Sequence, residues 1–138
     1  MNHSLSTEPL PRLAPFRTVF PFVFAIVLVF ALSAYPKALI PQGKYISWDK
    51  LAHLAEFGTL SYITARMLYY SGRAWWHRHW VVLLFMFGVL FAISDEWHQS
   101  FVAGRLSSVF DVIADSVGVL LGYLLFNRII QKRLQPKR

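Results

Sequence analysis

The residue types that could do chemistry gather in one short segment, residues 95–115. The chain has seven carboxylates, and four of them lie in this segment: Asp95, Glu96, Asp111 and Asp115. Long apolar runs precede and follow it. A charged group at the edge of a membrane segment persists only where a partner offsets its desolvation. The segment is therefore the first candidate for a functional site.

A second set of polar residues lies upstream, in residues 49–56. Asp49, His53 and Glu56 are spaced i, i+4 and i+7, so they share one stripe of a helix. The stripe is apolar farther along the chain, so its polar part is confined to the first half of that helix. A purely structural alternative stays open, in which Asp49 caps the helix and the other two side chains have local partners.

A matching stripe follows the first segment. Asp111, Asp115, Gly118 and Gly122 share one helical face. The two glycines form a small-xxx-small pair, which allows a neighbouring helix to approach closely. The face that packs inward is then also the face that carries the acids. In the alternative reading, Arg105 or a backbone amide satisfies these acids and they have a structural role.

Convergence of the two stripes predicts three overlapping sets of site residues. The candidate ligand-binding residues are Asp49, His53, Glu96, Gln99, Arg105 and Asp111. Arg105 suits a carboxylate or phosphate, although it could instead pair with Glu96 or Asp111. The candidate acid–base catalysts are His53, Glu56 and Asp115.

The residues leave the cofactor unknown and are compatible with a divalent metal. The candidate ligands are His53, Glu56, Asp111 and Asp115. Carboxylate oxygens favour Mg²⁺, Mn²⁺ or Ca²⁺, and His53 also admits Zn²⁺. No spacing matches a specific metal motif, and the sequence has no phosphate-binding glycine loop and no nucleophile motif. The chain has no cysteine, which excludes disulfides and thiolate ligands.

The composition indicates which elements position these residues. The chain has 138 residues, of which 56% are hydrophobic, and this is too apolar for a soluble domain of that size. Four stretches are long and apolar enough to cross a bilayer: residues 16–35, 49–70, 80–97 and 109–127. We therefore predict an all-α, four-transmembrane-helix bundle of two hairpins over residues 16–127. Residues 1–15 and 128–138 are then tails. A signal peptide is the alternative for the first stretch.

The basic residues predict the orientation of this bundle. The formal net charge is +7. Ten lysines and arginines fall on the side of the two termini and of residues 71–79, and four fall on the other side. The excess of positive charge makes both termini cytoplasmic and places the acidic segment outside. The basic residues do not gather on one face, so nucleic acid is not a predicted partner.

Two motifs resemble the VanZ-like family of small bacterial integral membrane proteins. One is Asp49-Lys50-Leu51-Ala52-His53. The other is Glu96-x-x-Gln99-x-Phe101-x-x-Gly104-Arg105, followed by Asp111, Gly118 and Gly122. The resemblance covers residues 49 to about 125 and implies a multi-pass protein of the bacterial cytoplasmic membrane. The family is named for an accessory determinant of teicoplanin resistance. Glu56 and Asp115 depart from its pattern, which has a tyrosine and often an asparagine there.

Three functions are compatible with these residues. The favoured one is an envelope protein whose outward polar pocket binds an anionic or amphipathic ligand, such as a lipid-linked precursor or an amphipathic drug. The alternative is a membrane enzyme, with or without a metal, that acts on a lipid head group. A proton-coupled transporter is the weakest, because the acids occupy only the outer half of the bilayer. Membrane lipids are the expected partners, and a homo-oligomer stays open.

Overall fold

The computed structural model of the protein describes residues 10–34, 48–104 and 108–134. These residues form four α-helices: α1 (Pro15–Ser33), α2 (Trp48–Tyr69), α3 (Ala74–Gln99) and α4 (Val109–Leu134). The one β pairing within the described residues is an isolated bridge between Arg12 and Ser71. The prediction of an all-α chain is confirmed.

Three of the four helices, α1, α3 and α4, are long and apolar enough to cross a membrane. The helices α3 and α4 extend beyond the spans predicted from hydropathy, since α3 begins at Ala74 rather than at residue 80 and α4 continues to Leu134 rather than to residue 127. The chain therefore has the makeup of an integral membrane protein, although α2 does not meet the same length-and-composition criterion.

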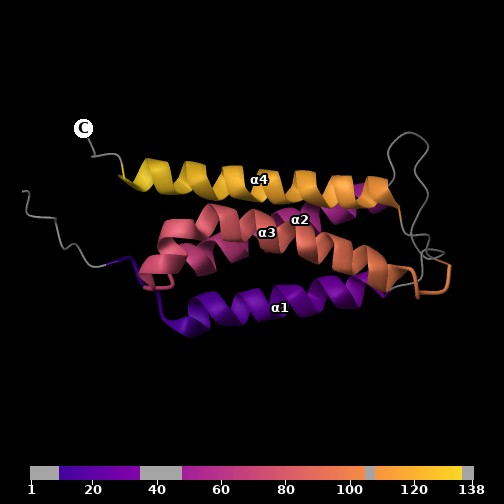
Figure 1. Cartoon of the computed structure of the whole chain (residues 1–138), viewed down its shortest axis with the longest axis horizontal. Coiled ribbons are helices and arrows are strands. Elements are labelled where there is room, and N and C mark those ends of the chain that lie inside the picture. The colour runs from indigo at the N-terminus through magenta and orange to yellow at the C-terminus, as the bar shows by residue number, and fades with distance from the viewer. Residues whose placement is uncertain (1–9, 35–47, 105–107, 135–138) are drawn as a thin grey trace, which may run out of the picture.

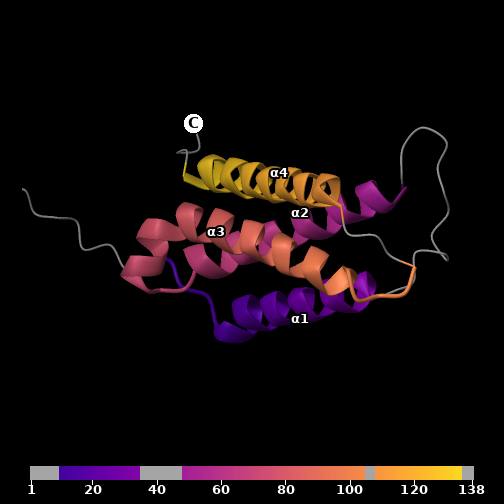
Figure 2. The ribbon, with the colours of Figure 1, turned by 45° about the vertical axis from the view of Figure 1, so that its right-hand side comes forward.

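The position of α2 explains its more polar sequence. It contacts each of the other three helices, and its most extensive contact is with α4. The helices α1 and α4 lie on opposite sides of the α2–α3 pair (Figures 1 and 2). Because α2 packs against three neighbours, many of its polar side chains can face protein rather than lipid, and a less apolar sequence is tolerated.

The helices alternate in direction, so the chain has two chemically different ends (Figure 1). We call the "acidic end" the one where α1 and α3 finish and α2 and α4 start. The "basic end" is the opposite one, where α1 and α3 start. A tight turn joins α2 to α3 at the basic end, and Gly72 adopts a positive φ of 70° there, which favours glycine.

The core between the ends is apolar and rich in aromatic rings. Phe57, Leu60 and Phe91 lie in a buried cluster nearer the acidic end. A second cluster, nearer the basic end, contains Leu84 and Phe126. The ring of Phe126 contacts four other aromatic rings, with centroids 5.5–6.4 Å away: Tyr62, Tyr69, Tyr70 and Trp80. This packing fixes the helices relative to one another between the acidic end and the basic end.

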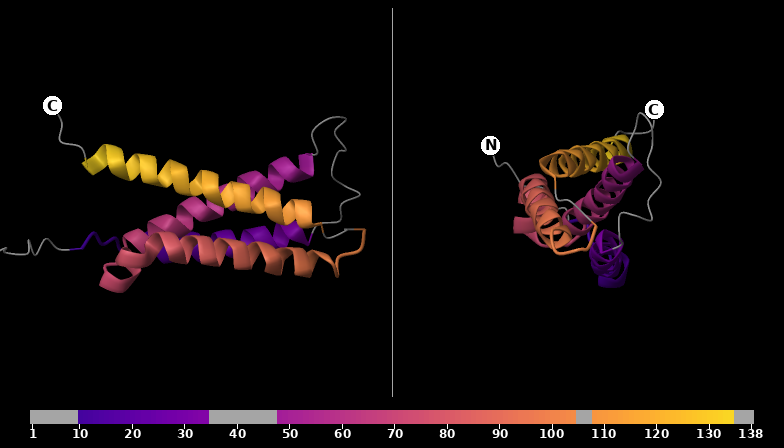
Figure 3. Two further views of the ribbon diagram at one scale, coloured as in Figure 1. Left: turned by 45° about the horizontal axis from the view of Figure 1, so that its top comes forward. Right: turned by 90° about the vertical axis from the view of Figure 1, so that its right-hand side faces the viewer.

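The contact between α2 and α4 is unusually close because it is made by glycines. A Cβ built on Gly122 would lie 2.2 Å from the carbonyl oxygen of Gly58, and one on Gly118 would lie 2.6 Å from that of Leu54. The two helices cross obliquely at this contact (Figure 3). The close approach brings the first turns of α4 against the first turns of α2, where the polar residues lie.

Candidate functional site

A buried group of polar side chains lies at the acidic end. We call it the "polar cluster", and it consists of Ser33, Lys50, His53, Asp95, Glu96, Gln99, Asp111 and Asp115. All four helices contribute at least one of these residues. Every member except Lys50 is buried. Burial of so many ionisable groups at one end of an apolar chain is costly unless they bind one another or a ligand.

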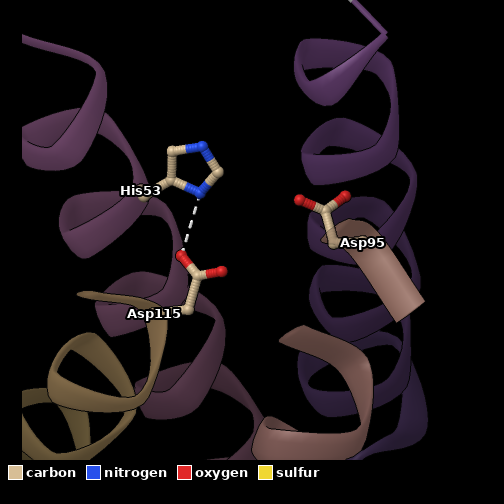
Figure 4. Close-up of side chains that lie close together, drawn as sticks. All are labelled: His53, Asp95 and Asp115. Carbon is tan, nitrogen blue, oxygen red and sulfur yellow. Dashed lines mark hydrogen bonds and ion pairs between the residues drawn. The ribbon is translucent and has the colours of Figure 1, made fainter. Parts of the chain in front are cut away.

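The centre of the polar cluster is a pair formed by His53 of α2 and Asp115 of α4. The Nδ1 atom of His53 lies 2.9 Å from Oδ1 of Asp115. Both side chains are almost fully buried, with 4% and 0% of their surface exposed. Figure 4 shows that the second oxygen of Asp115 points away from His53, on the side where Asp95 of α3 lies.

Asp95 joins α1 to α3. Its Oδ2 atom accepts a hydrogen bond of 2.7 Å from the Ser33 hydroxyl and another of 2.7 Å from the Gln99 side-chain amide. The Gln99 amide also donates to the Ser33 hydroxyl at 3.3 Å. Asp95 is completely buried, so these bonds replace part of its lost hydration.

Glu96 and Asp111 complete the polar cluster. The backbone N–H of Ser108 donates to Oε2 of Glu96 at 2.8 Å, which ties the end of α3 to the residue before α4. The ammonium group of Lys50 donates to Oδ1 of Asp111 at 2.7 Å. Lys50 is 47% exposed while Asp111 is 4% exposed, so this pair connects the interior of the polar cluster to its surface.

Three carboxylate oxygens of the polar cluster remain without a hydrogen-bond partner among the described residues. They are Oδ1 of Asp95, Oε1 of Glu96 and Oδ2 of Asp115, and all three are buried. Buried polar atoms are almost always satisfied in native proteins. Protons, water or a cation could therefore bind to these three oxygens.

The side chains come close enough together to share a ligand. One donor atom each from His53, Asp95 and Asp115 lies within 4.8 Å of the other two. A second triplet with the same property consists of His53, Glu96 and Asp111. His53 belongs to both triplets, so it is the point at which the acids of α3 and α4 meet α2.

Most of the residues singled out from sequence lie in the polar cluster. The structure brings together His53, Glu96, Gln99, Asp111 and Asp115. Their roles in binding, catalysis or metal coordination stay predictions. The side chain of Asp49 and the whole of Arg105 lie outside the described residues.

Glu56, which was predicted to act with these side chains, lines a cavity beside α1, and its part in binding, catalysis or metal coordination stays a prediction. It is half-buried and lines an apolar cavity of about 220 Å³ together with residues of α1 such as Ala25 and Val29. It belongs to neither triplet of potential ligands. The described geometry thus places Glu56 beside α1 rather than in the polar cluster.

Three members of the polar cluster were not singled out from sequence as site residues: Ser33, Lys50 and Asp95. For Asp95 a signal was available, because it precedes Gln99 by four residues and therefore shares its helical face. Lys50 lies one turn before His53, but its partner is on another helix. Nothing in the apolar sequence around Ser33 indicates that its hydroxyl meets a carboxylate.

Three exposed aromatic side chains lie at the acidic end, next to the polar cluster in sequence. Trp97, Phe101 and Phe110 each expose more than two thirds of their surface. The ammonium group of Lys50 lies 5.9 Å from the centroid of the Phe110 ring. An amphipathic rim of this kind is typical of residues at the level of lipid head groups.

Comparison with known proteins gives one match. A protein-family model described as VanZ/LLP1 matches residues 1–131. Searches of curated proteins and of solved structures find no match. The matched range includes all residues of the polar cluster and all four helices except the end of α4.

Proposed function

Because this chain belongs to the VanZ/LLP1 family, we propose that it is a multi-pass protein of the bacterial cytoplasmic membrane that binds an envelope ligand at its acidic end. The ligand carries an anionic group and an apolar part, as a lipid-linked precursor or an amphipathic drug does. A contribution to envelope maintenance or to glycopeptide resistance would follow from such binding.

The observation that carries this proposal is the position of Lys50. Its ammonium group is half-exposed, touches the buried Asp111 with one of its three donors, and lies beside an exposed aromatic ring. An incoming anion can use the remaining donors, while an acyl or polyprenyl chain packs on the aromatic rim. Polar recognition at the surface and apolar contact around it are what an amphipathic ligand requires.

The proposal requires the acidic end to face outward, as the distribution of basic residues predicts. The absence of cysteine makes this testable with single-cysteine variants. Ser100 at the acidic end and Lys132 at the basic end are both exposed. We expect a membrane-impermeant maleimide to label Ser100→Cys in intact spheroplasts and to label Lys132→Cys only after permeabilisation. The opposite pattern would place the polar cluster in the cytoplasm and contradict the proposal.

Replacement of Lys50 is expected to weaken binding of an anionic amphiphile. Lys50→Met removes the ammonium group, and loss of one charge-assisted hydrogen bond corresponds to about a tenfold lower affinity. The measurement is a titration of the purified protein with undecaprenyl phosphate or phosphatidylglycerol in detergent, with phosphatidylcholine as the zwitterionic comparison.

Two variants control this experiment. Lys132→Met removes an exposed lysine from the basic end and should leave the affinity unchanged. Lys50→Arg keeps the positive charge and should retain most of the affinity. Equal affinity of Lys50→Met and the unaltered protein for the anionic amphiphiles would overturn the assignment of the ligand site to Lys50.

The pair formed by His53 and Asp115 supports a second candidate function, an enzyme that acts on a lipid head group. A buried aspartate that binds one ring nitrogen of a histidine orients the ring for proton transfer at the other nitrogen. The test is release of the head group from the same lipids by purified protein. His53→Gln should abolish any such turnover, while Glu56→Gln should not.

A further inference from the structure

We propose that the polar cluster contains a divalent-cation site formed by the side chains of His53, Asp95 and Asp115. The site lies in the interior, between α2, α3 and α4, and is distinct from the surface position of Lys50. This inference does not depend on the envelope ligand proposed above, because it concerns different donor atoms and can be tested on the protein alone.

The charge balance of the polar cluster is the first argument. Among the side chains that the structure describes, four buried carboxylates, Asp95, Glu96, Asp111 and Asp115, face one ammonium group and one imidazole. Even if His53 is protonated, the described side chains leave two negative charges uncompensated. Isolated carboxylates are very costly at the edge of a membrane. A divalent cation supplies the missing charge.

The unpartnered oxygens are the second and independent argument. Asp95 and Asp115 each bind protein groups with one oxygen, and the other oxygen of each has no hydrogen-bond partner among the described residues. Both side chains are completely buried. In Figure 4 the two carboxyl groups and the ring of His53 point toward a common region. Buried acceptors oriented in this way lack a positively charged partner.

The distances fit a cation. One donor atom from each of the three side chains lies within 4.8 Å of the others. Two ligands on opposite sides of a metal are separated by twice the bond length, which is about 4.2 Å for Mg²⁺ and about 4.8 Å for Ca²⁺. Ligands of tetrahedral Zn²⁺ lie closer together, at roughly 3.4 Å. Small rotations of the side chains are therefore sufficient to close the site.

The donor set selects the class of metal. An imidazole nitrogen with two carboxylates favours Zn²⁺ or Mn²⁺ over Mg²⁺ and Ca²⁺, which prefer oxygen ligands alone. The second triplet, with Glu96 and Asp111, is the weaker candidate because Lys50 already binds Asp111. The first triplet has an unpartnered oxygen on each of its two carboxylates and is the one we assign.

The test is metal binding by the purified full-length protein, with any affinity tag removed. After treatment with EDTA, the protein is titrated separately with Zn²⁺, Mn²⁺, Mg²⁺ and Ca²⁺, and bound metal is measured by elemental mass spectrometry and calorimetry. We expect one Zn²⁺ or Mn²⁺ per chain and a higher melting temperature with metal. Asp95→Asn and Asp115→Asn should each weaken binding by at least the roughly 10- to 100-fold that is typical for loss of a hydrogen-bond partner of a metal ligand.

Glu56→Gln is the matched control, since it neutralises a carboxylate that α2 places outside the polar cluster. It should bind the cation like the unaltered protein. Lys50→Met removes a positive charge from the polar cluster and should strengthen cation binding while it weakens binding of the anionic amphiphile, which separates this inference from the ligand site. If Asp115→Asn fails to fold, judged by circular dichroism, Asp95→Asn and the metal-dependent melting temperature of the unaltered protein decide the question.

Two results would overturn the inference. One is folded protein that binds none of the four ions stoichiometrically, in which case protons neutralise the acids. The other is stoichiometric binding that Asp95→Asn and Asp115→Asn leave unchanged, which would place the metal elsewhere on the chain.

Discussion

Gly122→Ala is expected to lower the melting temperature of the protein in detergent by about 10 °C or more. The added Cβ would lie 2.2 Å from the carbonyl oxygen of Gly58 and 2.7 Å from Cβ of Ser61. The backbone of Gly58 cannot move aside as a flexible side chain could, so α2 and α4 must separate to make room for the added Cβ. Overpacking of this kind costs about 3 kcal/mol in a tightly packed interior, which corresponds to a shift of roughly this size.

Leu121→Ala is the matched control for that experiment. Leu121 is the neighbouring residue on α4, is 46% exposed, and should cost little when it is truncated. Val119, which also neighbours this face of α4, cannot serve as the control. It is buried, and its methyl groups pack within 2.9 Å of the position that a Cβ on Gly88 would take. Equal melting temperatures for Gly122→Ala and Leu121→Ala would show that α2 and α4 do not approach each other as closely as described.

Removal of the Asp95 side chain should destabilise the metal-free protein strongly. Asp95→Ala deprives the Ser33 hydroxyl and the Gln99 amide of a buried acceptor at 2.7 Å. Each buried donor that is left without an acceptor costs about 1–3 kcal/mol. The measurement is equilibrium unfolding in a mixed detergent, in the presence of EDTA so that bound metal does not contribute.

The control for this prediction keeps the acceptor and removes only the charge. Asp95→Asn retains an oxygen that can accept from the Ser33 hydroxyl and the Gln99 amide, so it should lose much less stability than Asp95→Ala. If the two variants unfold alike, the charge of Asp95 rather than its hydrogen bonds would hold α1 to α3. If neither differs from the unaltered protein, the network does not stabilise the fold.

The helices were predictable because hydropathy acts over long stretches of sequence. Each apolar run contains a helix, and the short connection around Gly72 was expected between residues 71 and 79. The ends were less predictable, since α3 begins at Ala74 through a polar and aromatic stretch that hydropathy alone does not assign to a span. The contact of α2 with all three other helices depends on packing, and its sequence showed only lower hydrophobicity.

Convergence of the acids was predictable because it depends on helical periodicity. Asp115 shares its stripe with Gly118 and Gly122. Because these glycines pack against α2, the stripe faces inward, toward the side of α2 that carries His53. The partners of individual side chains were not predictable, because they depend on how the helices rotate and slide relative to each other. The pairs Ser33–Asp95 and Lys50–Asp111 each join residues more than 60 positions apart in sequence.

Glu56 shows the limit of periodicity in particular. It follows His53 by three residues, which turns it about 60° around the helix axis relative to His53. Because α4 crosses α2 obliquely (Figure 3), the neighbour of a given stripe changes along the helix. His53 meets α4, while Glu56 lines a cavity with α1.

The contribution of every helix to the polar cluster has a consequence for biogenesis. The helix α4 is the last to be synthesised, and it carries Asp111 and Asp115, which bind Lys50 and His53 of α2. In a nascent or truncated chain without α4, Lys50 and His53 lack these two partners. The polar cluster is therefore complete only when the whole of the described chain has been made.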